Sequence, residues 1–192
     1  MPSDYQLIKE ENIRKRGEDN DDLLSLVSTL LYPDKTHFIY ELIQNVEDAL
    51  ERRDRNGQSQ ITNSEITFSL FKDRLELSHY GIPFNEEDVR GISDVVAGTK
   101  EKDLQQIGKF GIGFKSVYAY TASPEIHSGD EHFAILRFIR PEATSPRQLK
   151  PGETIIILPF NLEKVKSEDA YKQILNRLSN LSVRTLLFLK KT

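Results

Sequence analysis

One long amphipathic helix, predicted from about Thr36 to Arg53, constrains the fold more than any other segment. Its apolar residues recur at helical spacing and share one side, namely Leu42, Ile43, Val46, Ala49 and Leu50. That side must be buried against another layer, and we expect the layer to be a β-sheet. The opposite side carries a polar stripe, because Glu41, Asn45 and Asp48 fall at positions i, i+4 and i+7.

The remaining segments predict helices and hairpin-linked strands. Alternating residues over 65–71 and 74–78 indicate a hairpin around Lys72-Asp73, and further strands are expected at 132–139 and 154–158. Helices are expected in the first 31 residues with a break near Gly17, from Asn85 to about residue 92, at 112–119 and over most of 167–189. Strict βαβ alternation is absent. The chain therefore predicts an α+β fold, a two-layer sandwich in which one mixed, mostly antiparallel sheet is backed by helices.

Length and composition limit the classes of protein that fit. The 192 residues suit a single domain, and the apolar run at 187–189 without a clear cap indicates a piece of a longer protein, which we expect to be its N-terminal part. The net charge of -4 gives no indication of a nucleic-acid partner. Without cysteine, the chain has no disulfide, thiolate metal site or cysteine nucleophile. No segment has the length and apolarity of a membrane span, so we expect a cytoplasmic protein with no membrane partner.

A glycine-rich segment, Gly108-Lys109-Phe110-Gly111-Ile112-Gly113-Phe114-Lys115-Ser116, precedes the predicted helix at 112–119. Glycines let backbone N–H groups approach an anion at the start of a helix. The order GxxGxG reverses the dinucleotide fingerprint, and Phe114 separates Gly113 from the lysine that a Walker A loop needs. The segment therefore fits neither familiar phosphate motif, and an ordinary tight turn stays open as the alternative.

The polar stripe also allows two interpretations. A carboxylate such as Glu41 can activate a water molecule, and the amide oxygen of Asn45 can hold a hard cation such as Mg²⁺. The alternative is a solvated helix face without a chemical role.

The order of these motifs resembles that of the GHKL ATPases, which include gyrase B subunits, ninety-kilodalton heat-shock chaperones, MutL and histidine kinases. Residues 37–49 resemble the N-box helix of this family, the turn at Gly81 its first glycine box, and residues 108–113 its second. Pro151-Gly152-Glu153-Thr154-Ile155 resembles the Gly-Thr strand entry. The match spans about residues 23–160, and within the family its sequence most resembles that of sacsin-like ATP-binding domains. The resemblance implies the Bergerat fold.

The resemblance also implies roles for individual residues. Glu41 would be the catalytic general base for the hydrolytic water, Asn45 would ligate Mg²⁺, and Asp48 would line the nucleotide site. Nucleotide-binding residues would further include His79, Gly81, Gly108, Lys109, Phe110, Gly111, Ile112, Gly113, Phe114 and Thr154. Residues 93–107 would form a lid that closes over ATP, and either the lid or the N-terminal segment is a candidate for a homodimer contact. These roles imply ATP and ADP as ligands, Mg²⁺ as cofactor and a chaperone-like conformational switch with slow hydrolysis.

Two departures from the family pattern keep an alternative open. Most members have an aspartate that accepts a hydrogen bond from the adenine amino group, where this chain has His79. A neutral histidine can still accept through one ring nitrogen. Glu153 separates Gly152 from Thr154, which departs from the Gly-Thr pair. The alternative function is a non-catalytic nucleotide sensor or interaction scaffold. A histidine kinase is disfavoured, because none of the four histidines lies in a phospho-acceptor context.

Overall fold

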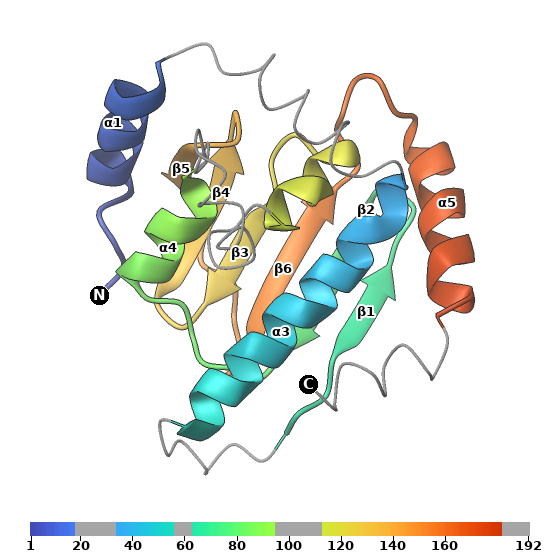
Figure 1. Cartoon of the computed structure of the whole chain (residues 1–192), viewed down its shortest axis with the longest axis horizontal. Helices are drawn as coiled ribbons and strands as arrows, with labels where there is room; N and C mark the ends of the chain where they lie inside the picture. Colours follow the sequence, from blue (N-terminus) through green and yellow to red (C-terminus); the bar gives the residue numbers. More distant parts are fainter. Residues whose placement is uncertain (18–33, 56–62, 95–112, 182–192) are drawn as a thin grey trace, which may run out of the picture.

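The computed structural model describes residues 1–17, 34–55, 63–94 and 113–181, whose strands form one six-stranded sheet (Figure 1). The strands are β1 (Thr67–Leu70), β2 (Arg74–His79), β3 (Glu125–Ser128), β4 (Glu131–Leu136), β5 (Arg140–Ala143) and β6 (Thr154–Pro159). Their order across the sheet is β1-β2-β6-β3-β4-β5, and every pairing is antiparallel. The predicted α+β sandwich is confirmed, with a sheet that is antiparallel throughout these strands.

The helices cover one face of this sheet. They are α1 (Tyr5–Arg16), α3 (Phe38–Arg55), α4 (Glu86–Ser93) and α5 (Ser167–Ser179), with the 3-10 helices η1 (Lys35–His37) and η3 (Gly113–Ala119). The apolar side of α3 is buried as the sequence predicts, and it shares one hydrophobic core with alternate residues of β2 and β6, namely Leu75, Leu77, Ile156 and Leu158. Alternate strand residues point to one face. Therefore Leu75, Leu77 and every second residue in line with them face the helices.

Capping residues set several helix ends where the sequence predicts them. Helix α1 ends before Gly17, which has a φ of 84° and accommodates a conformation that other residues rarely adopt. Asn85 caps α4 in a reciprocal box with Asp88. Helix α5 ends at Ser179 with Asn180 as its cap, and residues 182–189 of the mostly helical segment predicted there lie outside the described ranges. The second helix predicted in the first 31 residues lies outside the described ranges.

One prediction of local structure needs correction, and two strands were missed. The segment entered through Gly113 is a 3-10 helix rather than an α-helix. Strands β3 and β5 were not predicted from the sequence. β3 contains Glu125 and His127, which weaken an alternating apolar pattern, and β5 contains Pro141, which is tolerated because β5 is an edge strand.

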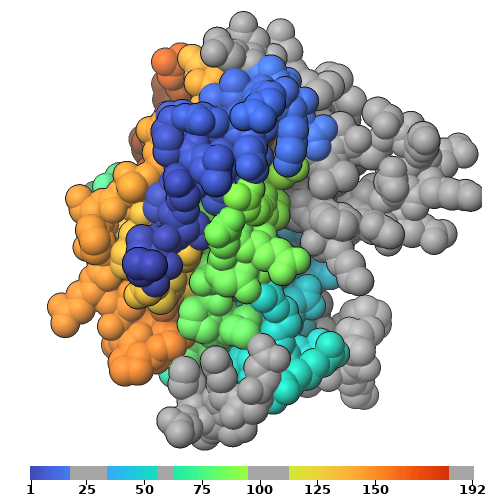
Figure 2. All heavy atoms as spheres, turned by 90° about the vertical axis from the view of Figure 1, so that its left-hand side faces the viewer, coloured from blue at the N-terminus to red at the C-terminus, as the bar shows by residue number. Residues whose placement is uncertain are grey.

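The N-terminal segment is tied to the sheet and to α4. Tyr5 Oη donates a 2.5 Å hydrogen bond to Glu131 Oε2, and Ser3 Oγ donates to Glu131 Oε1 at 2.7 Å. Buried Asn12 donates to the carbonyl oxygens of Ser93 and Ile139. Figure 2 shows this segment, in blue, lying against green α4 and the orange region near β5. Helix α1 thus closes the sheet edge that β5 would otherwise expose.

Within the described part of the chain, no helix combines the length and the apolarity that crossing a membrane requires.

Candidate functional site

Helix α3 carries the predicted catalytic stripe along its polar side. The Glu41 side chain is 20% exposed, and its Oε1 lies 3.2 Å from Nε2 of His37, one turn earlier. Asn45 and Asp48 follow on exposed positions of the same helix. Partial desolvation and the negative charge of Glu51 raise the pKa of Asp48. The stripe is therefore accessible at Asn45 and Asp48 and more enclosed at Glu41.

The last glycine of the glycine-rich segment lies directly against Glu41. A Cβ placed on Gly113 would lie 2.0 Å from Glu41 Oε2, far closer than any real contact. Any larger residue at this position would have to displace the carboxylate. Predicted site residues Gly108, Lys109, Phe110, Gly111 and Ile112 lie outside the described residues, as does the predicted lid after Asp94.

Phe114, also predicted to bind nucleotide, has its side chain in the hydrophobic core and is 1% exposed. We therefore expect any contact of Phe114 with a nucleotide to come from its backbone. The described end of the glycine-rich segment thus joins the core to the polar stripe of α3.

A second glycine lies where the loop after β2 crosses α3. A Cβ on Gly81 would lie 2.6 Å from the Cβ of Ala49. The Ile82 N–H donates to the Ala49 carbonyl at 3.0 Å, and Arg53 Nη1 donates to the Tyr80 carbonyl at 2.7 Å. Arg53 is 3% exposed, so this loop is fixed to the helix by buried contacts on both sides of Gly81.

Three polar residues form a row at the same end of the central strands. In the sheet register Thr154 pairs with His79 on β2 and with Ser128 on β3. His79 alternates with Leu75 and Leu77, and Thr154 with Ile156 and Leu158, so the row faces the helix layer. His79 is 2% exposed, and Thr154 and Ser128 are fully buried.

This buried row is held by hydrogen bonds of its own. The Ser128 and Thr154 hydroxyl oxygens are 2.6 Å apart, and Ser128 Oγ accepts from the Phe84 N–H at 3.0 Å. His79 Nδ1 accepts from the Gly81 N–H at 3.1 Å. Burial lowers the pKa of His79 to about 4, so its ring is neutral at pH 7.

The departure at Glu153 is explained by a tight turn before β6. The Glu153 N–H donates to the Lys150 carbonyl, Pro151 occupies the second turn position, and Gly152 has a φ of 73° at the third. These are the residue types that a type II turn requires. Glu153 Oε2 also accepts from the Lys150 N–H at 3.0 Å. Gly152 therefore serves the turn, and Thr154 begins the strand.

Neither Ser128 nor buried Lys115 was predicted from the sequence to have a role in the site. Ser128 joins the row only through the long-range pairing of β3 with β6. Lys115 Nζ donates to the carbonyl oxygens of Ile92 at 2.7 Å and Phe138 at 2.6 Å, which links η3 to the end of α4 and to the β4–β5 turn. Burial lowers the pKa of Lys115 to about 7, and the nearby Asp94 opposes this effect.

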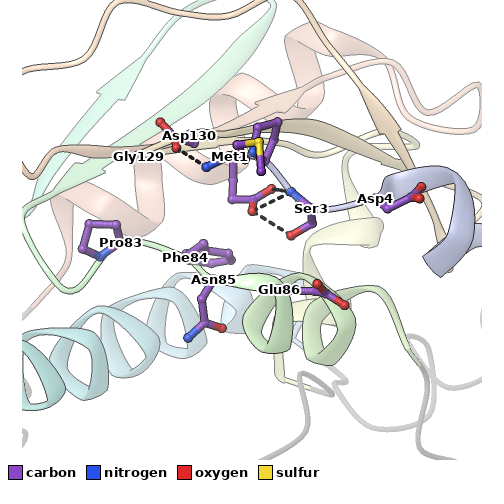
Figure 3. A pocket seen from close by; sticks show the side chains of 11 residues that line it. Met1, Ser3, Asp4, Pro83, Phe84, Asn85, Glu86, Gly129 and Asp130 are labelled. Atoms are coloured by element: carbon purple, nitrogen blue, oxygen red, sulfur yellow. Dashed lines mark hydrogen bonds and ion pairs between the residues drawn. The ribbon is translucent and has the colours of Figure 1, made fainter.

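Two open hollows lie away from the predicted site residues. One, of about 310 Å³, lies between residues 1–4, the loop 83–86 and the turn 129–131 (Figure 3). In this hollow the Met1 ammonium contacts Asp130 at 2.8 Å. The other, of about 460 Å³, lies beside η1 and α5. Neither is lined by Glu41, Asn45, His79 or Gly81.

The described residues contain no group of three or more histidine, aspartate or glutamate side chains placed to hold a metal ion. A hard cation that takes a few protein oxygens and completes its shell with phosphates does not need such a cage. Asn45 is exposed one turn after Glu41 on α3, so this helix offers an amide oxygen and a carboxylate four residues apart, which suits that mode of binding.

Comparison with known proteins gives consistent relatives. The sacsin domain family matches residues 21–153. Protein NO VEIN of Arabidopsis thaliana is 33% identical over 133 residues, which are 66% of this chain and 5% of that protein. Human sacsin is 31% identical over 153 residues, 70% of this chain and 3% of sacsin. Chaperone protein HtpG of Sulfurovum sp. (strain NBC37-1) is 31% identical over 126 residues, 55% of this chain and 20% of that protein. The chain therefore spans a small fraction of each relative's length.

Proposed function

This chain belongs to the sacsin domain family, and from that premise we propose that it binds ATP over α3 and hydrolyses it slowly in a chaperone-like conformational cycle. One observation carries the proposal. The backbone of Gly113, at the end of the glycine-rich segment, contacts the carboxylate of Glu41 so closely that a Cβ would lie 2.0 Å from Oε2. A phosphate-binding segment and a general base need this proximity for the base to act on a water beside the terminal phosphate.

We propose that Glu41 takes a proton from the attacking water. His37 Nε2 lies 3.2 Å from Glu41 Oε1 and restricts the orientation of the carboxylate. The remaining oxygen, Oε2, is the one beside Gly113. Burial leaves the Glu41 side chain 20% exposed, enough for a water molecule to reach it. Glu41 thus combines access to water with a fixed direction.

Asn45 is the residue that would hold Mg²⁺, through its amide oxygen. When bound, Mg²⁺ would neutralise part of the phosphate charge. Asn45 is exposed one turn after Glu41, on the side of α3 that the core does not cover. Asp48 follows at the next turn, where we expect it to line the nucleotide site.

The base would lie at the other end of the site, where the loop at Gly81 crosses α3. The buried row His79, Thr154 and Ser128 supplies polar groups there, and Ala49 and Gly81 pack without a gap between helix and loop. We further propose that residues 93–107 fold over bound nucleotide, as the sequence predicts, and that this closure excludes water from the reaction.

The test separates binding from turnover. Titration calorimetry with ATP and ADP, with and without Mg²⁺, should show binding that depends on Mg²⁺ and weakens in Asn45→Ala. Phosphate release should fall by about 10²–10⁴-fold in Glu41→Gln while ATP still binds. Glu51→Gln, in the same helix with its side chain 61% exposed, is the matched control and should behave like the wild type. Equal turnover in Glu41→Gln and Glu51→Gln would refute the role of Glu41.

A nucleotide sensor without hydrolysis is the second candidate, favoured by one observation. The position where the family pattern has an adenine-binding aspartate holds a buried, neutral histidine, His79. A sensor would bind nucleotide with the same dependence on Asn45 but release no phosphate, and Glu41→Gln would change nothing. The two candidates therefore differ in the turnover of the unmodified chain.

A further inference from the structure

A backbone contact of His79 determines which of its ring nitrogens donates a hydrogen bond and which accepts one, at the proposed base-binding end of the site. The Gly81 N–H can only donate, so the His79 Nδ1 that lies 3.1 Å away must accept with its lone pair. A neutral imidazole carries one hydrogen, which must then be on Nε2. His79 is 2% exposed, and within the described ranges no other group hydrogen-bonds to its Nε2. The ring of this largely buried residue therefore presents an N–H donor at Nε2.

The protonation state supports this assignment. Burial lowers the pKa of His79 to about 4, so the ring stays neutral from pH 5 upward. The ring cannot turn to exchange its nitrogens without losing the Gly81 bond. The neighbouring geometry also resists change, because Gly81 is wedged against Ala49 and the Ile82 N–H is bonded to the Ala49 carbonyl.

The other members of the row do not impose a polarity. Ser128 Oγ accepts from the Phe84 N–H and shares one hydrogen bond with Thr154 Oγ1, in which either hydroxyl can donate. In either arrangement one hydroxyl hydrogen and at least one lone pair are left for a ligand. The hydroxyl pair can therefore serve a donor or an acceptor on the base, while His79 Nε2 serves an acceptor alone.

We propose that His79 reads the base by donating a hydrogen bond from Nε2, so that the site accepts 6-oxopurine nucleotides at least as well as adenine nucleotides. The inference rests on the proposed nucleotide site. A 6-amino group would bring its hydrogens against the Nε2 hydrogen, whereas a 6-oxo group offers an acceptor. His79 is then a specificity-determining residue, and its polarity is the reverse of that of an aspartate at the same position.

The direct test compares ADP with inosine diphosphate, which differ only at C6 and N1 of the base. Titration calorimetry of the full chain with Mg²⁺ should show that ADP binds no more tightly than inosine diphosphate. His79→Asp replaces the donor with an acceptor that the Gly81 N–H can still reach, and it should favour ADP by about tenfold or more. His132→Asp adds the same charge at a histidine outside the row and should keep the wild-type ratio.

A second measurement needs no nucleotide. Nitrogen-15 NMR of the labelled chain, with His79 identified by its missing signals in His79→Gln, should show a neutral ring protonated at Nε2 at pH 7. A ring protonated at Nδ1 would overturn the inference whatever binds. So would a wild-type preference for ADP of tenfold or more, or a ratio that His79→Asp leaves unchanged. If neither diphosphate binds, the nucleotide site and the specificity of His79 are both refuted, which distinguishes failure of the proposed function from failure of this inference alone.

Discussion

Replacing a single glycine by alanine should have opposite effects at Gly81 and Gly91. At Gly81 the new Cβ would lie 2.6 Å from Ala49 Cβ and 3.0 Å from the Ala49 carbonyl carbon, whereas ordinary van der Waals contact is 3.4–4 Å. Ala49 belongs to α3 and its carbonyl accepts from Ile82, so neither partner can move freely. Overpacking of this kind costs about 1–3 kcal/mol of unfolding free energy.

Gly91 provides the matched control. It lies inside α4, and a Cβ there would meet nothing within 4 Å. Alanine is the better helix former, so Gly91→Ala should stabilise the protein by up to about 1 kcal/mol. For a chain of this size, 1 kcal/mol shifts the thermal midpoint by about 2–4 °C. We therefore expect Gly81→Ala to lower Tm by about 2–12 °C and Gly91→Ala to leave it unchanged or raise it.

A double mutant locates the strain. Ala49→Gly removes the nearest atom but leaves the backbone carbon at 3.0 Å, so it should rescue Gly81→Ala only in part. Because glycine costs about 1 kcal/mol inside a helix, the rescue is measured as the coupling energy of the double-mutant cycle and not as absolute stability. Urea unfolding of the four proteins supplies the values. A Gly81→Ala variant as stable as the wild type, or a coupling energy of zero, would show that the loop does not press on α3.

Other substitutions test the site and its supports. Gly113→Ala places a Cβ 2.0 Å from Glu41 Oε2, at the movable end of that side chain, so the protein should still fold. Phosphate release should fall at least tenfold while ATP binding is kept. A variant with wild-type turnover would contradict the contact between Gly113 and Glu41. Burial lowers the pKa of Lys115 to about 7 in the folded protein. Between pH 7 and 10 the unfolded chain therefore binds a proton that the folded protein has lost. The free energy of unfolding should then rise with pH, by up to about 1.4 kcal/mol per pH unit. Urea unfolding of Lys115→Met across that range should show the slope reduced, and an unchanged slope would refute the shift. Tyr5→Phe removes the hydrogen bond to Glu131 and should lower the free energy of unfolding in urea by about 1–3 kcal/mol. An unchanged free energy of unfolding would show that packing alone holds the N-terminal segment.

The parts of the fold that follow from local chemistry could be predicted from the sequence. Helix α3 has an apolar side wide enough to define its burial, and the Asn85 cap and the Gly17 break act within a few residues of themselves. Strand β3 could not be predicted, because its residues owe their burial to the strands on either side. The 3-10 geometry of η3 also escaped prediction, since helical spacing over seven residues does not distinguish it from an α-helix.

The site shows the same division. The spacing of Glu41, Asn45 and Asp48 along one helix is a local property, and the structure keeps it. That Gly113 meets Glu41, and that Ser128 joins Thr154, depends on contacts between residues far apart in the chain. No periodicity encodes such contacts. A glycine in a sequence predicts a backbone with more allowed conformations. Only the fold shows which atom occupies the space where a side chain would lie.

The histidine at the proposed base-binding position shows how far a comparison of residue types can mislead. From the sequence, a neutral His79 is expected to accept a hydrogen bond through one ring nitrogen, in place of an aspartate. In the fold, the Gly81 N–H occupies the one lone pair of the neutral ring, so at the proposed site the ring would donate to a base where an aspartate would accept. The close approach to Ala49 independently requires glycine at position 81. Gly81 therefore determines both the position of the loop and which ring nitrogen of His79 carries the hydrogen. Because both effects pass through one residue, a change at Gly81 should disturb base recognition even where the protein still folds.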